Sequence, residues 1–425
     1  MEDNTLTKIN KNEKKHFYYD ESYHDLSITQ KDGIQNINTE NTSTYFVVSF
    51  VGVEENKTND FLNKYQVLEQ EYKNLIGQKE DHEFKGTIIN SKNYNKGFSS
   101  MRKVFIRFYT KLFDLLDEYS VIINISTISK FEIVVSRIFI KYIIELGDFY
   151  DDKEVYNLIY GTVKFLEQHK TEKLVKLMHS DEYNSKKLLL EIKKIINYVL
   201  ETRLNFELKN RECNFACLLN QQINNIEKNL NIEEKYKWDY YFSFDGFKNL
   251  LNELDINSEN IYLDIDGKGN RTQKIYDTAI SMFPNATIER FESKDNLGIR
   301  ISDFISNLIG RFIKVIDDEC TDKRRKIEEN SNFNKKIFLD EEWFNLDEEA
   351  FDCYRKIGEF FNNRSKIYWT THVGTYDDIP LVVYSLFQYF YEQKNYEDFK
   401  NISSFEHSEK LNNLIVRKHI YRHGL

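Results

Sequence analysis

The clearest pattern near the start of the chain lies at residues 16–22, HFYYDES, where an aromatic run ends in two acids and a serine. Aromatic residues favour a pleated, half-buried surface, so this run predicts a β-strand. The two-residue period of a strand places Phe17 and Tyr19 on one face and Asp20, with its even-numbered neighbours, on the other. Glu21 then leaves the opposite face from Asp20. An acid at a strand end either begins a turn or binds a ligand, and this stretch alone leaves both open.

A second alternating stretch, residues 260–266 (NIYLDID), predicts another strand. Its aliphatic residues share one face, while Asp264 and Asp266 share the opposite face. Asp264 closes the apolar alternation and is the preferred ligand, whereas Asp266 either takes that role or caps the following turn. Residues 45–53, YFVVSFVGV, are apolar on both faces, which predicts a central strand of a sheet.

Helical spacing separates these strands, which predicts an α/β or α+β core. We expect helices near residues 58–77, 100–118 and 275–282, and further strands at 121–126 and 287–291. Apolar residues from 301 to 313 form a strong helical stripe. Ser302, Ser306 and Gly310 lie on a neighbouring face of that helix, beside Asp303, and small residues there allow a helix to approach a sheet closely.

The chain divides into five segments by pattern. We expect a flexible tail at 1–15, the first part of the core at 16–130, an all-helical insertion at 131–240, the second part of the core at 241–318, and an accessory, mainly helical C-terminal region at 319–425. Within the insertion, helical spacing is strongest at 133–146, 155–166, 188–208 and 215–230. In the C-terminal region we expect a helix at 347–361, a strand at 366–373 and helices beyond Pro380.

Composition and charge argue against several classes of protein. The net charge of −10 argues against binding nucleic acid through global charge, although a local basic run at residues 323–326, KRRK, is either a phosphate contact or a solvated helix surface. The 4 cysteines include no zinc-binding set. No apolar run approaches the ~20 residues of a membrane helix. The polar start lacks an apolar leader, so we expect a cytoplasmic protein.

Acidic residues recur where strands end and where the last core helix begins. They are Asp20, Glu83, Asp264 with Asp266, and Asp303. Converging carboxylates are what a pair of Mg²⁺ or Mn²⁺ ions requires, and hard cations choose oxygen ligands, so no histidine or cysteine cluster is needed. Each acid also has a structural alternative: a turn at Asp20 or a helix-dipole partner at Asp303.

Four motifs together resemble the bacterial family of domain of unknown function 3800, of the RNase H-like superfamily. They are DES at residues 20–22, EFKG at 83–86, YLDID at 262–266 and SKDNLGIRISDF at 293–304. The resemblance covers about half of the chain, residues 16–126 and 240–316. Three departures stand out: Tyr23 replaces the usual Gly, Ser302 replaces Ala, and the helical insertion is unusually long.

The resemblance implies an RNase H-like mixed sheet flanked by helices and a divalent-metal nuclease site. Asp20, Glu83, Asp264 and Asp303 would be the catalytic metal ligands. Lys85 and Lys294 would contact phosphate, or be surface lysines. Family members are often associated with genome defence, so we expect a two-metal nuclease, with nucleic acid as substrate, that acts in antiviral defence. The alternative is a non-catalytic RNase H-like scaffold that binds a partner protein or nucleic acid, and in either case the insertion is a candidate partner surface.

One rival motif lies near the end of the chain. Residues 417–423, RKHIYRH, have the Arg-to-His spacing of the helical RNases called HEPN domains. The segment lacks the usual polar residue after the arginine and offers several overlapping arginine and histidine choices. We therefore favour a basic tail that docks or frays.

Overall fold

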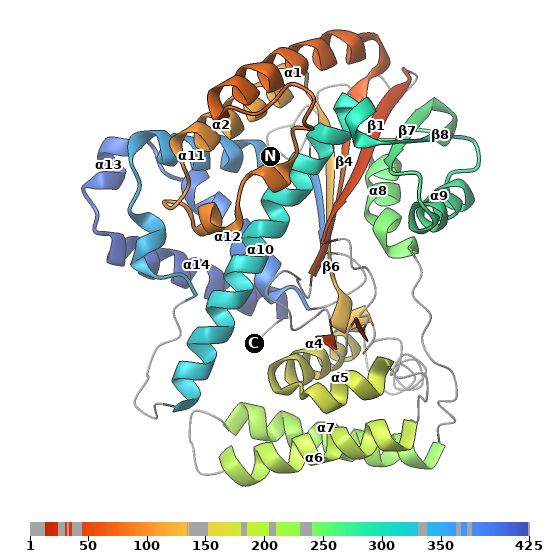
Figure 1. Cartoon of the computed structure of the whole chain (residues 1–425). Helices are drawn as coiled ribbons and strands as arrows, with labels where there is room; N and C mark the ends of the chain where they lie inside the picture. The colour runs from red at the N-terminus through yellow and green to blue at the C-terminus, as the bar shows by residue number, and fades with distance from the viewer. Residues whose placement is uncertain are drawn as a thin grey trace, which may run out of the picture.

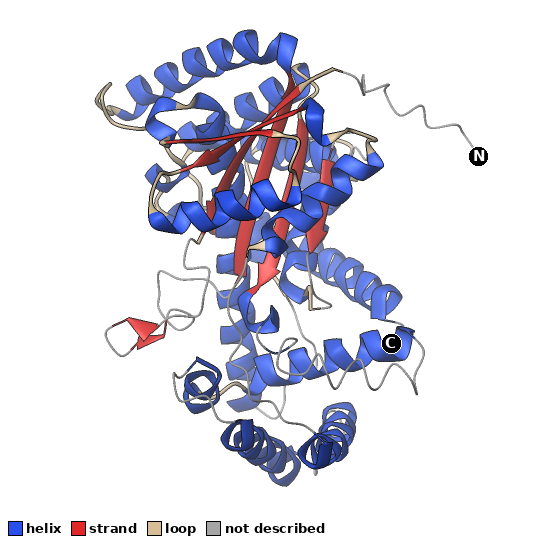
Figure 2. Cartoon of the chain, turned by 90° about the vertical axis from the view of Figure 1, so that its right-hand side faces the viewer, coloured by secondary structure: helices blue, strands red, loops and turns tan. Residues whose placement is uncertain are grey.

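A computed structural model describes residues 13–23, 30–31, 34–35, 45–133, 135, 152–179, 185–203, 210–229, 240–329, 338–362, 367–371 and 376–423. Its centre is a mixed sheet, seen close to edge-on between helices in Figure 1 and with its strands side by side in Figure 2. The strands are β1 (Lys15–Ser22), β4 (Tyr45–Glu54), β6 (Ile122–Ser129), β7 (Ile261–Asp266), β8 (Thr287–Phe291) and β9 (Ile367–Thr371). The predicted α/β class with a mixed sheet is confirmed.

The strand order is β8-β7-β1-β4-β6-β9. β4 lies antiparallel to β1 on one side and to β6 on the other, although residues 55–121, which include two helices, separate β4 from β6 along the chain. β7 lies parallel to β1 on the other side, with Tyr19 beside Ile265, and β8 lies parallel to β7. The carboxyl ends of β1, β7 and β8 therefore meet at one edge of the sheet.

Helices cover both faces of the sheet (Figures 1 and 2). On one face lie α1 (Glu55–Ile76), α2 (Lys103–Glu118), α10 (Leu297–Glu329), α11 (Glu348–Asn362) and α12 (Asp378–Tyr391). On the other lie α8 (Tyr241–Glu253) and α9 (Asn270–Met282). The alternation predicted for β1 is confirmed, since Phe17 and Tyr19 pack in the core beneath α8 while Tyr18 packs in the core beneath α10.

The middle of the chain is helical wherever it is described. It contains α4 (Asp152–His169), α5 (Glu172–His179), α6 (Ser185–Arg203) and α7 (Asn210–Asn229), which lie together below the sheet in Figure 1. Most of the helix predicted at 133–146 lies outside the described residues. Tyr160 of α4 donates a hydrogen bond to Asp378 of α12 at 2.7 Å, and Lys164 pairs with Asp378 at 2.9 Å. Polar contacts thus tie this helical layer to the C-terminal region.

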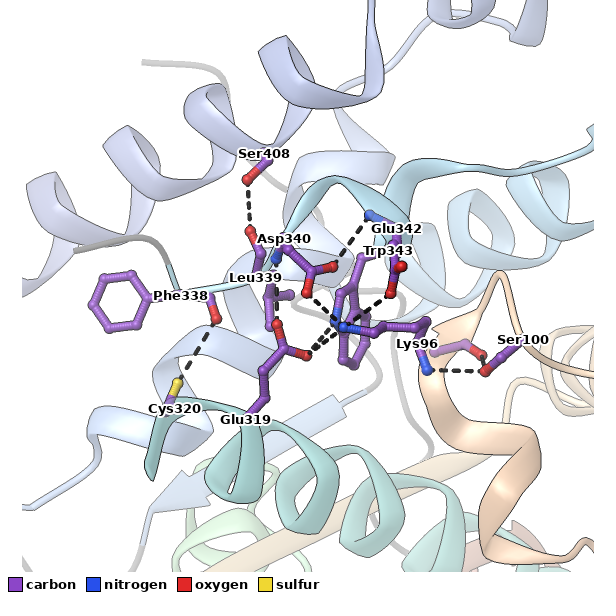
Figure 3. A network of polar contacts seen from close by, with 11 residues as sticks. Lys96, Ser100, Glu319, Cys320, Phe338, Leu339, Asp340, Glu342, Trp343 and Ser408 are labelled. Carbon is purple, nitrogen blue, oxygen red and sulfur yellow. Dashed lines mark hydrogen bonds and ion pairs between the residues drawn. The ribbon is translucent and has the colours of Figure 1, made fainter. Parts of the chain in front are cut away.

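The C-terminal region is part of the sheet and its core. The strand predicted at 366–373 is β9, which pairs in parallel with β6, a partner that the sequence did not predict. α13 (Tyr396–Lys400) and α14 (Ser404–His423) follow. Figure 3 shows a polar network in which Lys96 pairs with Asp340 at 2.5 Å and with Glu319 of α10 at 3.4 Å. This network holds residues 338–344 against α10.

Some elements differ from the expected ones. α1 begins at Glu55, three residues before the expected start at residue 58, and Thr58 lies inside it, donating a hydrogen bond to the carbonyl of Glu54 at 3.2 Å. Gly77 ends α1 in a left-handed conformation, as predicted. α8 and the short pair β2 (Gln30–Lys31) and β3 (Ile34–Gln35) were not predicted, nor was β5 (Asn95–Phe98). Single 3₁₀ turns lie at η1 (Gly86–Ile88), η2 (Ser91–Tyr94), η4 (Ser258–Asn260), η5 (Ser293–Asp295) and η6 (Glu341–Phe344).

None of the described helices combines the length and apolarity that crossing a membrane requires.

Candidate functional site

Two aspartates leave neighbouring strand ends on the same face of the sheet. β1 and β7 pair in parallel up to Tyr19 and Ile265, so the next residues, Asp20 and Asp266, follow side by side. α10 packs on this face and carries Asp303. The charges of both Asp303 and Asp266 act on Asp20, which indicates that the three carboxylates are neighbours. We refer to Asp20, Asp266 and Asp303 as the carboxylate cluster.

Asp20 is almost fully buried, with 2% of the residue's surface exposed. Burial raises its pKa well above the ordinary value, and repulsion from Asp303 and then Asp266 raises it further. A hydrogen bond from the backbone N–H of Glu21 to Asp20 Oδ1, at 2.6 Å, opposes this rise. The net effect is that the fold disfavours the charged form of Asp20. Such a group is typical of a functional site rather than of a stabilising contact.

Small residues let α10 approach β1 and β4 closely. A Cβ atom on Gly298 would lie 2.3 Å from the ring of Tyr18, and one on Gly310 would lie 2.5 Å from Ser22 Oγ. Ser302 lies between them, and its hydroxyl is 2.6 Å from the hydroxyl of Ser49 on β4. The predicted close packing of this helix on the sheet is confirmed. It explains how Asp303, on a helix, comes close to Asp20 on a strand.

Asp303 is held by the segment that carries the EFKG motif. The backbone N–H of Gly86 donates to Asp303 Oδ2 at 2.5 Å, and Asn307 Nδ2 donates to Asp303 Oδ1 at 2.7 Å. Phe84 is buried and packs on Phe304 with ring centroids 5.0 Å apart, which fixes the segment on α10. A Cβ on Gly86 would lie 2.6 Å from Asn307 Cβ, so only glycine allows this approach.

Glu83 and Lys85 lie at the border of the carboxylate cluster. Lys85 Nζ is 2.9 Å from Glu83 Oε2, and 34% of the lysine side chain is exposed. Burial lowers the pKa of Lys85, but the hydrogen bond to Glu83 and the charges of Glu83, Asp266 and Asp303 raise it overall. Glu83 Oε1 is buried and accepts no hydrogen bond from any described residue. Glu83 therefore keeps one carboxylate oxygen available for a ligand.

Asp264, the acid preferred from the sequence, lies in a different environment from Asp266. Its Oδ2 is 2.9 Å from His16 Nε2 and accepts a hydrogen bond from Asn296 Nδ2 at 2.7 Å. Asn296 Oδ1 in turn accepts from the N–H groups of Gly298 and Ile299, which caps the start of α10. The geometry thus gives Asp264 a role in positioning α10, and places Asp266, the alternative ligand, beside Asp20.

The other residues singled out in the sequence lie at three different positions in the fold. Lys294 lies in η5 with an exposed side chain. Glu21 is buried on the opposite face from Asp20, where its Oε2 accepts a hydrogen bond from Tyr19 at 2.7 Å. The KRRK run lies within α10, but its side chains are outside the described part of the structure.

Tyr23, which stands where the resembling family has glycine, has a φ angle of 62°. This left-handed conformation is costly for a residue with a Cβ and is the reason glycine is suited to the position. The ring of Tyr23 lies against Arg311, 5.7 Å from its guanidinium carbon. Packing with α10 therefore holds a strained turn directly after the carboxylate of Asp20.

Two basic residues of the RKHIYRH segment contact neighbouring elements of the fold. His419 Nε2 lies 2.8 Å from Tyr160 Oη, and Arg422 forms an ion pair with Asp377. These contacts dock α14 on α4 and α12, as expected for a docking tail.

The donor types of the carboxylate cluster fit a hard divalent cation, because carboxylate oxygens are the ligands that Mg²⁺ and Mn²⁺ prefer. The raised pKa of Asp20 and the available oxygen of Glu83 are the features that a cation would compensate. Among the described residues, however, no three histidine, cysteine or acidic side chains stand close enough, as placed, to hold a metal ion. Like-charged carboxylates repel one another, so binding would have to draw them together.

Comparison with protein-family models, with curated proteins and with solved structures found no match to this chain in any of the three.

Proposed function

We propose that this chain is a divalent-metal-dependent nuclease that hydrolyses phosphodiesters of nucleic acid at the carboxylate cluster. The observation that carries the proposal is that Asp20, Asp266 and Asp303 converge from two strand ends and a buried helix, against the repulsion that raises the pKa of Asp20. A fold accepts such a cost mainly where function requires it.

The strand arrangement supports an RNase H-like core. Such a core has an antiparallel three-stranded meander whose first strand is flanked by parallel strands. β1, β4 and β6, with β7 and β8 beside β1, agree with this strand order and these directions, whereas the two helices between β4 and β6 depart from a simple meander. β9, at the far edge beside β6, would then be an addition made by the C-terminal region.

Each residue of the site has a stated role in this proposal. Asp20, Asp266 and Asp303 hold the cations, with Glu83 at the border offering its available oxygen. Two such ions, when bound, supply an activated water and stabilisation of the leaving oxygen. Lys85 and Lys294 orient the phosphate by charge.

Further parts of the proposal rest on the family resemblance. The protein would act in the cytoplasm, in antiviral defence, and the helices α4–α7 would select a substrate or a partner protein. The runner-up function is a non-catalytic RNase H-like scaffold. It is favoured by the lack of a closed ligand set among the described residues and by the hydrogen bonds that already engage Asp303.

A cleavage assay separates the two functions. The full chain is incubated with Mg²⁺ or Mn²⁺ and single-stranded, duplex and hybrid substrates, beside Asp20→Ala and Asp303→Ala. We expect cleavage of at least one substrate by the wild type, lost in both variants and on chelation. Equal activity in all three proteins would refute the assignment of the site. Inactivity of the wild type on every substrate would favour the scaffold.

A further inference from the structure

We propose that Lys85 is a built-in counter-ion of the carboxylate cluster, which a divalent cation must displace in order to bind. This inference rests on the proposed function, because it assigns to one residue of that site a control over metal binding. It differs from a phosphate-contacting role, since it concerns the protein before any substrate is bound.

The position of the Lys85 ammonium group supports this role. It lies 2.9 Å from Glu83 Oε2, and the charges of Asp266 and Asp303 act on the same group. It is thus attracted by three of the acids that the metal site would use. An ammonium so placed neutralises part of the negative charge that would otherwise attract a cation.

The backbone around Lys85 is fixed while its side chain can move. Phe84 is 1% exposed between the rings of Phe108 and Phe304, and the N–H of Gly86 is bound to Asp303. The Cα of Lys85 therefore stays beside the cluster. The side chain is one-third exposed and has four rotatable carbons, so the ammonium can swing to solvent without disturbing the packing.

The carboxylate of Glu83 is the group on which a cation would replace the Lys85 ammonium. Its Oε2 holds Lys85, whereas its buried Oε1 accepts no hydrogen bond from the described residues. Within the part of the chain that the structure describes, Oε1 therefore has no hydrogen bond to lose when the carboxylate turns to a cation. The displaced Lys85 ammonium would then be able to contact an anionic group such as a phosphate. Metal binding would in this way prepare the site for its substrate.

Calorimetric titration of the full chain with Mn²⁺ tests the inference. Lys85→Met keeps most of the apolar stem and removes the charge. We expect it to bind Mn²⁺ about 3- to 10-fold more tightly than the wild type, in proportion to a partly exposed ion pair. Lys92→Met is the matched control, because Lys92 is exposed and forms no ion pair among the described residues, and it should bind as the wild type does.

The outcomes are distinct. If the wild type binds Mn²⁺ and Lys85→Met binds it equally or more weakly, the counter-ion role is refuted while the nuclease proposal stands. If neither protein binds Mn²⁺, the metal site and the counter-ion role fail together.

A second measurement needs no variant of Lys85. The wild type is acetylated with an amine-reactive reagent, with and without Mn²⁺, and the modified peptides are quantified by mass spectrometry. Displacement predicts that Mn²⁺ raises the rate of acetylation at Lys85 and leaves Lys92 unchanged. A rate at Lys85 that is unchanged or lowered would contradict displacement.

Discussion

The two acids of β7 leave the same face of one strand, yet they lie in opposite kinds of environment. Asp264 Oδ2 lies 2.9 Å from His16 Nε2 and accepts a hydrogen bond from the amide of Asn296. Asp266 lies beside Asp20, where like charges raise the pKa of Asp20. The two acids of β7 therefore differ in what they contact: Asp264 accepts a hydrogen bond from the residue that caps α10, whereas Asp266 adjoins a second carboxylate.

The largest expected effect is on catalysis. Asp266→Asn removes one carboxylate of the proposed metal site at nearly constant volume, so we expect metal-dependent cleavage to fall by at least ~100-fold. Asp264→Asn changes a residue that only positions α10, so its activity should stay within ~10-fold of wild type. Initial cleavage rates at saturating Mn²⁺ would measure both. The reverse order would return the ligand role to Asp264.

The second expected effect is on the free energy of unfolding. Here the change at Asp264 should matter more than the change at Asp266. Asp264→Ala leaves Asn296 without its acceptor at the start of α10 and removes the carboxylate beside His16, so the free energy of unfolding should fall by ~1–3 kcal/mol. Urea denaturation with a chelator present would measure this loss. A loss below ~0.5 kcal/mol would show that Asp264 does not support α10.

Asp20→Asn should instead stabilise the chain at neutral pH. The folded state raises the pKa of Asp20 above its ordinary value of 3.8, so it binds that proton more tightly than the unfolded state does. The stability that this group contributes is therefore present at acidic pH and is lost as the pH rises from about 3.8 through the raised folded pKa. Asn removes this loss, so the variant should be more stable at pH 7 by at least ~1 kcal/mol. A variant less stable at pH 7 would show that the charge of Asp20 is compensated in the fold.

The sequence predicted most of the helices and strands of the fold, but not all of the strand pairs that they form. The strand β8 has the predicted bounds, and the two-faced apolar run of residues 45–53 is the central strand β4. The place of β9 beside β6 and the existence of α8 were not predicted, because pairing between distant segments leaves little trace in local periodicity.

The same limit applies to the site. Alternation puts Asp264 and Asp266 on one face, but the register of β7 on β1 and the partner of Asn296 decide between them. Both depend on contacts between residues far apart in the sequence. His16 was not singled out for the same reason, since nothing in its own segment points to Asp264. The small residues of α10 were informative because helical spacing is itself local.

The smallest expected effect concerns the turn after Asp20. Tyr23 has a left-handed backbone and packs its ring near Arg311. Tyr23→Ala loses the packing and keeps the strain, whereas Tyr23→Gly loses the packing and relieves the strain. We therefore expect the glycine variant to be the more stable of the two by ~1 kcal/mol, measured by urea denaturation. An alanine variant of equal or greater stability would mean that the turn is not strained.

The central claim is that Asp20, Asp266 and Asp303 form a divalent-cation site while Asp264 supports the fold beside it. Titration of the full chain with Mn²⁺, followed by calorimetry, tests this directly and needs no substrate. We predict that the wild type and Asp264→Asn bind Mn²⁺ with similar affinity, and that binding is lost in Asp266→Asn and Asp303→Asn. Equal binding by the wild type, Asp266→Asn and Asp303→Asn, or loss in Asp264→Asn alone, would contradict it.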